Sequence, residues 1–367
     1  MNLRGNVVRV DLEQLKRNAK LLVNEMQPDT RVMAVVKADA YGHGLAEAAL
    51  AFAGAGVMSL CVATPDEGVR LRDKGVRLPI LVLGPSMPEA AEACVYNGLS
   101  QTVADIHAVN RIAYAAARLH KEAAVHIKVD TGMNRVGLRG AAAFHAVADA
   151  VRNAPGVILE GVYTHFADAD NPDERFTLFQ LERFLTLCAQ LPRTVVRHAA
   201  ASAAALRLPQ TRLDGVRLGI ALYGCPPVTA ALPLDFAMRW TTEVVFHKTV
   251  PSGETIGYGR AYTAGRDMTV ATLSVGYGDG YHRCAAGTGK VLIGGVFAPI
   301  VGRVCMDQIM VDVTGIDGAL TGAEAVLLGT QGDRRITPED LGKSFGTIAY
   351  EALLSPSQRV RREWIGG

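Results

Sequence analysis

The sequence lacks a strong excess of either charge, a long apolar run and any paired cysteine motif. Its 367 residues carry a formal net charge of +2, so no strong field attracts nucleic acid or an anionic membrane surface. No apolar stretch approaches the ~18–20 residues that span a bilayer. The first residues open no apolar run of the kind found in signal peptides. We therefore expect a cytoplasmic protein that binds neither nucleic acid nor membrane.

The cysteines and histidines exclude further classes of site. Six cysteines are scattered along the chain and form no Cys-x-x-Cys pair: Cys61, Cys94, Cys188, Cys225, Cys284 and Cys305. This pattern favours free thiols over disulfides or a structural zinc site. His43, His165 and His198 have neither the clustered spacing nor the carboxylate partners of a metal site, so no metal is expected.

The order of apolar patterns predicts the fold of the first two thirds of the chain. Short apolar runs alternate with longer Ala-rich helical patterns. The expected strands are 32–36, 57–62, 80–83, 99–103, 124–129, 158–163, 194–198 and 213–220. The expected helices are 43–53, 65–74, 88–97, 105–121, 140–153 and 172–190. Eight strand–helix units in succession predict a closed (β/α)₈ TIM-type barrel, which we prefer to a doubly wound sheet.

After Pro226 and Pro227 the pattern changes to short β-rich runs separated by glycine. These runs are 236–250, 268–277, 289–304, 307–314 and 323–330, and a helical pattern returns only at 337–352. They predict a C-terminal, mainly antiparallel β domain. We assign 11–234 to the α/β barrel, with a first helix at 11–25. The β domain then comprises 235–367 together with a strand from residues 1–10.

Lys37 is the most informative single residue. It ends the β-branched run Arg31-Val-Met-Ala-Val-Val-Lys37 and precedes a polar turn. A lysine at the end of a buried strand is partly desolvated, which lowers its pKa and makes the amine nucleophilic. An ordinary lysine at a strand end is the alternative, and the residue alone does not decide between them.

Polar side chains also stand where other predicted barrel strands end. They are Lys128, Asp130, Arg135, Tyr163, His165, Arg197, His198, Ser202 and Arg217. The C-terminal ends of the strands form the active site of such barrels, so these side chains should line one pocket. Ser202 and the turn Gly219-Ile220 suit a phosphate site after the last two strands. A nucleophilic lysine opposite a phosphate site indicates pyridoxal 5′-phosphate.

Seven stretches carry a more specific pattern. They read Val-Val-Lys37-Ala-Asp-Ala-Tyr41-Gly-His-Gly, Lys128-Val-Asp-Thr-Gly-Met-Asn-Arg135-Val-Gly, Thr164-His165-Phe, Val216-Arg217-Leu-Gly219-Ile220-Ala-Leu-Tyr-Gly, Gly257-Tyr258-Gly-Arg-Ala-Tyr262, Gly276-Tyr277-Gly-Asp-Gly280 and Val301-Gly-Arg-Val-Cys305-Met306-Asp307-Gln. In these stretches, and in their order, the chain resembles the alanine racemase family of fold-type III pyridoxal-phosphate enzymes. The resemblance covers essentially the whole chain. It implies interconversion of L-alanine and D-alanine, an amino-acid substrate, and a supply of D-alanine for peptidoglycan.

The resemblance implies a pair of catalytic bases. Lys37 carries the cofactor and serves as one base, while Tyr258 acts on the opposite face of the substrate Cα. Racemisation removes a proton from one face of a planar carbanion and returns one to the other, which is simplest with a base on each side. A tyrosine at its ordinary pKa of ~10 is a poor base at neutral pH. The resemblance implies that His165, linked to Arg217, adjusts the pKa of Tyr258. Arg217 is assigned to the pyridine nitrogen, where an always-charged group makes the ring a weaker electron sink.

The resemblance also implies the remaining site residues. Arg135 binds the substrate carboxylate or the cofactor's phenolic oxygen, and Lys128 matches a lysine that is carboxylated on Nζ in several family members. The cofactor contacts are assigned to Tyr41, His165, Ser202, Arg217, Gly219, Ile220 and Tyr350. Cys305 and Met306 complete the substrate pocket. In the family, residues of the β domain complete the site of the other subunit, so a homodimer with shared active sites is implied.

Two departures and several alternatives remain. Ala201 stands where the family commonly has Asn, immediately before Ser202, and the tail 355–364 replaces a usual Arg-Val-Pro-Arg ending. A racemase of the same family that prefers serine, lysine or a broader range of amino acids is the nearest alternative. A decarboxylase leaves Tyr258 and the Cys-Met-Asp-Gln motif unexplained. A non-catalytic pyridoxal-phosphate carrier leaves the β domain unexplained.

Overall fold

The computed structural model describes residues 5–26, 28 and 30–366, which form two compact units. The barrel unit comprises Leu15–Ala40 and Gly44–Asp235, and the β unit comprises 5–14, Tyr41–His43 and 236–366. Within the described residues, no helix is long and apolar enough to cross a membrane. We retain 11–234 and 235–367 as proposed domain boundaries.

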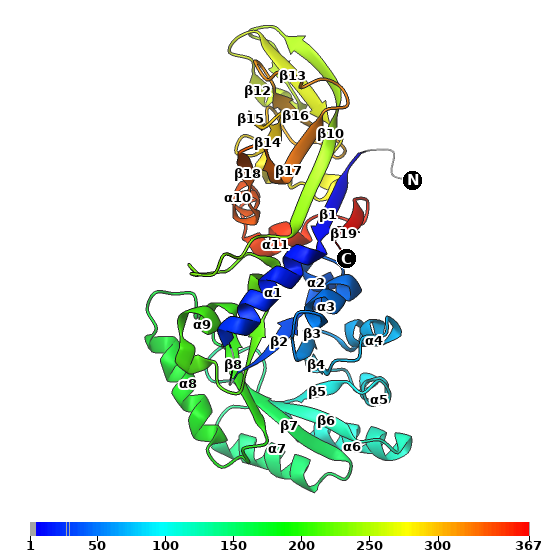
Figure 1. The fold of residues 1–367 in the computed structure, drawn as a ribbon, viewed down its shortest axis with the longest axis vertical. Coiled ribbons are helices and arrows are strands. Elements are labelled where there is room, and N and C mark those ends of the chain that lie inside the picture. Colours follow the sequence, from blue (N-terminus) through cyan, green and yellow to red (C-terminus); the bar gives the residue numbers. More distant parts are fainter. Residues whose placement is uncertain (1–4, 27, 29, 367) are drawn as a thin grey trace. The chain divides into compact units, whose positions relative to one another are not determined.

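Eight parallel strands close into a barrel in chain order, with the last strand pairing the first (Figure 1). The strands are β2 Arg31–Val35, β3 Ser59–Val62, β4 Ile80–Val82, β5 Ser100–Val103, β6 Ala123–Lys128, β7 Val157–Tyr163, β8 Val196–Ala201 and β9 Gly215–Leu218. The helical segments are α1 Leu12–Met26, α2 Lys37–Tyr41, α3 Leu45–Ala53, α4 Pro65–Asp73, α5 Ala90–Tyr96, α6 Ile106–Leu119, α7 Ala141–Asn153, α8 Arg175–Cys188, α9 Ser202–Arg207, η1 Pro209–Thr211 and η2 Ile220–Tyr223. The predicted (β/α)₈ TIM-type barrel is confirmed.

Burial explains why these segments form a barrel. The three residues of β4 are all buried, as expected for a parallel strand covered on both faces. Helix α6 buries Val109, Ile112 and Ala116 on one face, at the 3.6-residue period of an amphipathic helix. Asp105 caps this helix, because its Oδ1 accepts a hydrogen bond from the backbone N–H of Ala108 at 2.7 Å.

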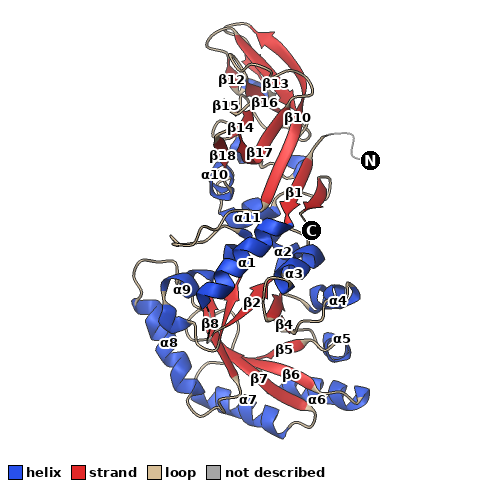
Figure 2. Cartoon of the chain, in the orientation of Figure 1, coloured by secondary structure: helices blue, strands red, loops and turns tan. Residues whose placement is uncertain are grey.

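The β unit is built around one mixed sheet. Its strands run in the order β15-β14-β17-β10-β1-β19, with β13, β16 and β18 attached at the side, and β11 and β12 form a separate ribbon. The strands are β1 Val7–Asp11, β10 Met238–Val250, β11 Thr255–Ile256, β12 Tyr262–Thr263, β13 Met268–Leu273, β14 Lys290–Ile293, β15 Val296–Pro299, β16 Ile309–Asp312, β17 Glu324–Gln331, β18 Arg334–Ile336 and β19 Arg361–Ile365. Its helical segments are η3 Tyr258–Arg260, η4 Tyr277–Asp279, η5 Arg283–Ala285, α10 Pro338–Ser344 and α11 Ala349–Leu354. Strands dominate this unit, whereas helices surround the strands of the barrel unit (Figure 2).

The predicted β domain is confirmed, and so is a strand from the N-terminal residues. Strand β1 pairs antiparallel with β10 and parallel with β19. Residues 1–4 of the predicted N-terminal strand lie outside the described part of the chain. The pairings of the described strands in this sheet are antiparallel except for the parallel pair of β1 with β19.

Three boundaries in the β unit differ from the sequence prediction. The run 289–304 forms a hairpin instead of one strand, because Gly294 and Gly295 adopt φ of 58° and 75° between β14 and β15. The helical pattern 337–352 is two helices, and Gly346 at φ 68° stands between them. The run 268–277 ends as a strand at Leu273. Positive φ favours glycine, so the first two breaks fall where an ordinary residue would be strained.

Candidate active site

Lys37 stands at the C-terminal end of β2, at the mouth of the barrel. Its backbone neighbour Val36 donates a hydrogen bond to the carbonyl of Cys61, which continues the barrel pairing up to the lysine. The side chain is half-buried, and burial together with the nearby Arg135 guanidinium lowers the pKa of the Lys37 ammonium. A lowered pKa leaves more neutral, nucleophilic amine at physiological pH.

The turn after Lys37 has an unusual backbone. Ala38, Asp39, Ala40 and Tyr41 all have φ of 53°, a left-handed conformation. For L-residues this costs roughly 1–2 kcal/mol each, so surrounding contacts must hold the turn in place. The Ala38 N–H donates to Glu67 Oε1 at 2.6 Å, and the Asp39 carboxylate accepts from the backbone of α3 at 3.0 Å. Glu67 belongs to the capping box of α4, so the start of α4 fixes the turn that follows Lys37.

Lys128 ends β6 and is buried inside the barrel unit. Burial, followed by the charges of Arg217 and Arg135, places the pKa of its ammonium well below the ordinary value. Its Nζ lies 4.2 Å from the centroid of the Tyr163 ring. Burial and the two nearby guanidinium charges therefore all disfavour the protonated, cationic form of Lys128.

The loop that carries Arg135 folds back on the end of β6. Asp130 Oδ1 accepts hydrogen bonds from the N–H groups of Gly132 and Asn134 at 2.9 and 3.0 Å. The N–H of Leu138 donates to the carbonyl of Lys128 at 2.9 Å and closes the loop. Arg135 itself is exposed at this loop, so its fork of donors is open to an anionic ligand.

Arg217 on β9 is buried and held from several sides. Its guanidinium donates to the carbonyls of Thr164, His198 and Ala199 at 2.8–3.1 Å. It also donates to His165 Nδ1 at 3.2 Å and to His198 Nδ1 at 2.8 Å. Burial and the Arg217 charge place the pKa values of both histidines well below the ordinary range, so both imidazoles are neutral.

Ser202 opens α9 and lies against the turn that follows β9. Its Oγ accepts hydrogen bonds from the N–H groups of Gly219 and Ala221 at 3.1 and 3.4 Å. The N-cap of α9 is Ala201, so Ser202 does not cap its own helix. The hydroxyl and the Gly219-Ile220 turn are thus brought together as the sequence predicts.

The charges at the barrel mouth favour an anionic ligand. Four cationic side chains lie close enough to lower the pKa of one another or of His165. They are Lys37, Lys128, Arg135 and Arg217. A cluster of cations that repel one another is stabilised when anions bind among them. A phosphate, a phenolate and a carboxylate are the anions that this donor set suits, which fits both pyridoxal 5′-phosphate and an amino acid.

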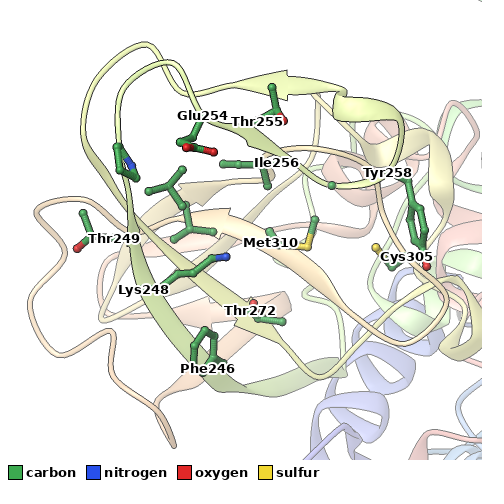
Figure 3. A pocket seen from close by; sticks show the side chains of 14 residues that line it. Phe246, Lys248, Thr249, Glu254, Thr255, Ile256, Tyr258, Thr272, Cys305 and Met310 are labelled. Atoms are coloured by element: carbon green, nitrogen blue, oxygen red, sulfur yellow. The ribbon is translucent and has the colours of Figure 1, made fainter.

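The other predicted residues lie in the β unit. Tyr258 begins η3 and its side chain is 71% exposed, while Met306 is 53% exposed. Tyr258 and Cys305 line a pocket of about 510 Å³ between β10, β11, β13 and β16 (Figure 3). Tyr41 and Tyr350 also belong to this unit, and their ring centroids are 6.1 Å apart.

A neighbouring loop positions Cys305 and Met306. Their carbonyls accept hydrogen bonds from the N–H groups of Tyr277 and Gly278 at 3.0 and 2.8 Å. A Cβ on Gly276 would lie 2.4 Å from both carbonyl oxygens, so only glycine permits this approach. In the atypical C-terminal tail, Arg359 adds an ion pair to Asp307 at 2.7 Å and so fixes the loop further.

Two family models match consecutive parts of the chain. The alanine racemase N-terminal domain matches residues 10–227, and the alanine racemase C-terminal domain matches 237–364. The chain belongs to the alanine racemase family. The barrel-plus-β-domain fold and the amino-acid racemase class predicted from the motifs are thereby confirmed.

Relatives of this alanine racemase family member match it over nearly the full length. The alanine racemase of Halothermothrix orenii is 40% identical over 368 residues, which cover 98% of this chain and 97% of the relative. The alanine racemase structure from D-cycloserine-producing Streptomyces lavendulae superposes with a TM-score of 0.93 at 33% identity, covering 100% of this chain and 98% of that one. A histidine racemase structure from Leuconostoc mesenteroides subsp. sake has a TM-score of 0.91 at 29% identity, covering 100% and 99%.

Three residues at this racemase family member's barrel mouth and interior received no role from the sequence. They are Glu67, His126 and Glu160. The Thr-Pro-Asp-Glu pattern of 64–67 is typical of a capping box. It does not predict that Glu67 also accepts a hydrogen bond from the Ala38 N–H. His126 precedes Lys128 by two residues on β6, so the period of the strand places both on one face.

Within the described residues, no group of three or more His, Cys, Asp or Glu side chains is placed to hold a metal ion.

Proposed function

We propose that this protein interconverts L-alanine and D-alanine with pyridoxal 5′-phosphate as cofactor. Lys37 carries the proposal, since it is a half-buried lysine with a lowered pKa at a cationic barrel mouth. The relatives named alanine racemase support the choice of substrate. We further propose that the enzyme acts in the cytoplasm and supplies D-alanine for peptidoglycan. Its six free cysteines suit a reducing compartment.

The proposed cofactor contacts follow the anion-binding character of the site. Lys37 would hold the cofactor covalently, and Arg217 would donate to the pyridine nitrogen. The phosphate would lie against Ser202, Gly219, Ile220, Tyr41 and Tyr350. When bound, pyridoxal 5′-phosphate supplies an electron sink that acidifies the α-proton of the amino acid.

Lys37 and Tyr258 are proposed to move the proton on opposite faces of the substrate Cα. The lowered pKa of Lys37 favours the neutral amine that accepts a proton. His165 is proposed to support Tyr258. Because Arg217 donates to His165 Nδ1, the single proton of the neutral imidazole lies on Nε2, where it is available to the tyrosine oxygen.

The substrate carboxylate is proposed to bind Arg135, with Cys305 and Met306 completing the pocket. Tyr258 and Met306 are exposed on the β unit, which suits residues that complete a site on another subunit. We therefore propose a homodimer in which each barrel uses the β unit of its partner.

Lys128 is expected to be carboxylated on Nζ. Its lowered pKa provides a neutral amine that would attack the carbon of CO₂ and lose a proton, and the nearby charges of Arg217 and Arg135 would stabilise the resulting anion. A native mass spectrum in bicarbonate buffer should show the added mass of one CO₂, and Lys128→Met should lack it. The exposed Lys74→Ala variant, as a control, should keep it. An unmodified wild-type mass in bicarbonate contradicts the assignment.

Proton exchange in D₂O tests the proposed function directly. Incubation with L-alanine should exchange the α-proton and invert the configuration, as followed by NMR and optical rotation. Exchange without inversion contradicts the two-base mechanism, and the absence of both contradicts the activity. L-serine, L-lysine and L-histidine in parallel test the broader-specificity alternative, and histidine is included because a solved histidine racemase shares the fold.

A further inference from the structure

A line of hydrogen-bonded side chains crosses the interior of the barrel and ends at Arg217. Glu160 Oε2 lies 3.0 Å from His126 Nε2, and His126 Nδ1 lies 2.9 Å from His198 Nε2. His198 Nδ1 in turn lies 2.8 Å from the Arg217 guanidinium. We call these four residues the relay. They come from the four consecutive strands β6, β7, β8 and β9.

The chemistry of the two ends fixes the direction of every hydrogen bond in the relay. A guanidinium only donates, so His198 Nδ1 accepts and the proton of the neutral His198 lies on Nε2. At the other end a carboxylate only accepts, so the Nε2–H group of His126 donates a hydrogen bond to Glu160 Oε2. His126 Nδ1 then accepts the hydrogen bond from the Nε2–H group of His198. One tautomer of each histidine therefore satisfies all three contacts.

The backbone is shaped to build the relay. In the β6–β7 pair, Val125 lies opposite Leu159 and His126 opposite Gly161, so Glu160 is an extra residue in a β-bulge. Bulges redirect side chains and are common beside active sites. A Cβ on Gly161 would lie 2.3 Å from His126 Nδ1, so glycine leaves the space that the imidazole occupies.

Neighbouring side chains hold Glu160 as an ionised acceptor. Its side chain is 40% exposed, and the hydroxyl of Ser100 donates to the same Oε2 at 2.6 Å. The hydrogen bond from His126 lowers the pKa of the Glu160 carboxyl. The far end of the relay is thus a carboxylate that water reaches, while His126 and His198 are buried.

Tyr163 holds the plane of the His198 imidazole, which lies in the middle of the relay. Its ring stacks on the His198 imidazole, with centroids 4.8 Å apart and planes at 6°. Its hydroxyl is held by Thr102 at 2.8 Å and by the carbonyl of Leu83 at 2.9 Å. Burial raises the pKa of Tyr163 to about 12, so the ring stays neutral beside Arg217.

We propose that Glu160 is a positioning residue that sets the tautomers of His126 and His198 and thereby presents an acceptor nitrogen to Arg217. Its effect on catalysis rests on the proposed function, in which Arg217 contacts the pyridine nitrogen. The tautomers themselves do not depend on the cofactor. Structure and catalysis can therefore be tested separately.

Histidine ¹⁵N NMR of the full-length protein, without added cofactor, tests the tautomers. Wild type should show His126 and His198 as neutral rings protonated on Nε2. Glu160→Leu removes the acceptor and should shift both pairs of ring nitrogens, whereas Glu160→Gln keeps an acceptor oxygen and should shift them less. Glu92→Leu, which breaks only a surface ion pair with Arg118, should leave them unchanged. Unchanged tautomers in Glu160→Leu overturn the proposal.

Steady-state kinetics of the same holoenzymes test the positioning role. Glu160→Leu should lower kcat for alanine about tenfold, the size of effect seen when the hydrogen-bond partners behind metal ligands are removed, with little change in KM. Glu160→Gln should recover most of the loss. Gly161→Ala, which displaces His126 and keeps the carboxylate, should resemble Glu160→Leu. A tautomer shift with unchanged kcat overturns the positioning role, whereas an inactive wild type overturns the proposed function and leaves the NMR result standing.

Discussion

The Lys37→Ala variant is expected to lose alanine racemisation by a factor of ~10³ or more, because it removes both a base and the proposed covalent attachment of the cofactor. Its fold should be retained, since Lys37 is only half-buried and the adjoining turn is held by Glu67 through the backbone of Ala38. Racemisation is measured by optical rotation in both directions. Retention of pyridoxal 5′-phosphate after gel filtration provides a second measurement, and the variant should lose it.

Two further variants separate the chemistry of Lys37 from its charge. Lys37→Arg keeps a cation at the barrel mouth but cannot act as a neutral amine, so it should be as inactive as Lys37→Ala. Lys74→Ala removes an exposed lysine at the end of α4 and should behave as wild type. Activity within tenfold of wild type in either Lys37 variant would exclude the lysine as a base.

The Tyr258→Phe variant should lower racemisation ~10²–10⁴-fold, the usual range for loss of a general base. The side chain is 71% exposed, so loss of the hydroxyl should leave stability unchanged. In D₂O the variant should still exchange the α-proton of one enantiomer, since Lys37 remains on its face, while inversion falls. Equal loss of exchange from both enantiomers contradicts a role on a single face.

Mixing the two inactive variants tests the shared site. A mixed dimer of Lys37→Ala and Tyr258→Phe subunits contains one site with both bases if the subunits share active sites. Random re-association of equal amounts should restore about a quarter of the wild-type activity, because half of the dimers are mixed and each has one intact site of two. No restoration would place Lys37 and Tyr258 of one chain in the same site.

The barrel was predictable because its signals are local. Each strand is a short apolar run, each helix has a buried face, and the strand ends bring Lys37, Lys128 and Arg217 to one mouth. The family motifs mark most of the residues that we assign to the site. Those roles stay predictions until the variants are measured.

The features that the sequence did not predict depend on contacts between distant residues. Ala38-Asp-Ala-Tyr41 consists largely of helix-forming residues, yet Glu67 and neighbouring contacts hold it in the left-handed conformation. Glu160 is an ordinary strand residue until the bulge directs it to His126. Strand β19 is rich in charge and pairs with β1, which lies more than 300 residues earlier in the chain.

The pairing of β1 with β10 and β19 constrains the order of folding during synthesis. Val7 emerges from the ribosome long before its partners Thr241 and Arg361, so this strand must remain unpaired while the whole barrel is made. Contacts of such long range slow folding, and an unpaired apolar strand invites aggregation in the meantime. A fragment that ends near residue 235 would keep that strand without a sheet to join. Separate expression of the barrel should therefore work better when β1 is removed with the β unit.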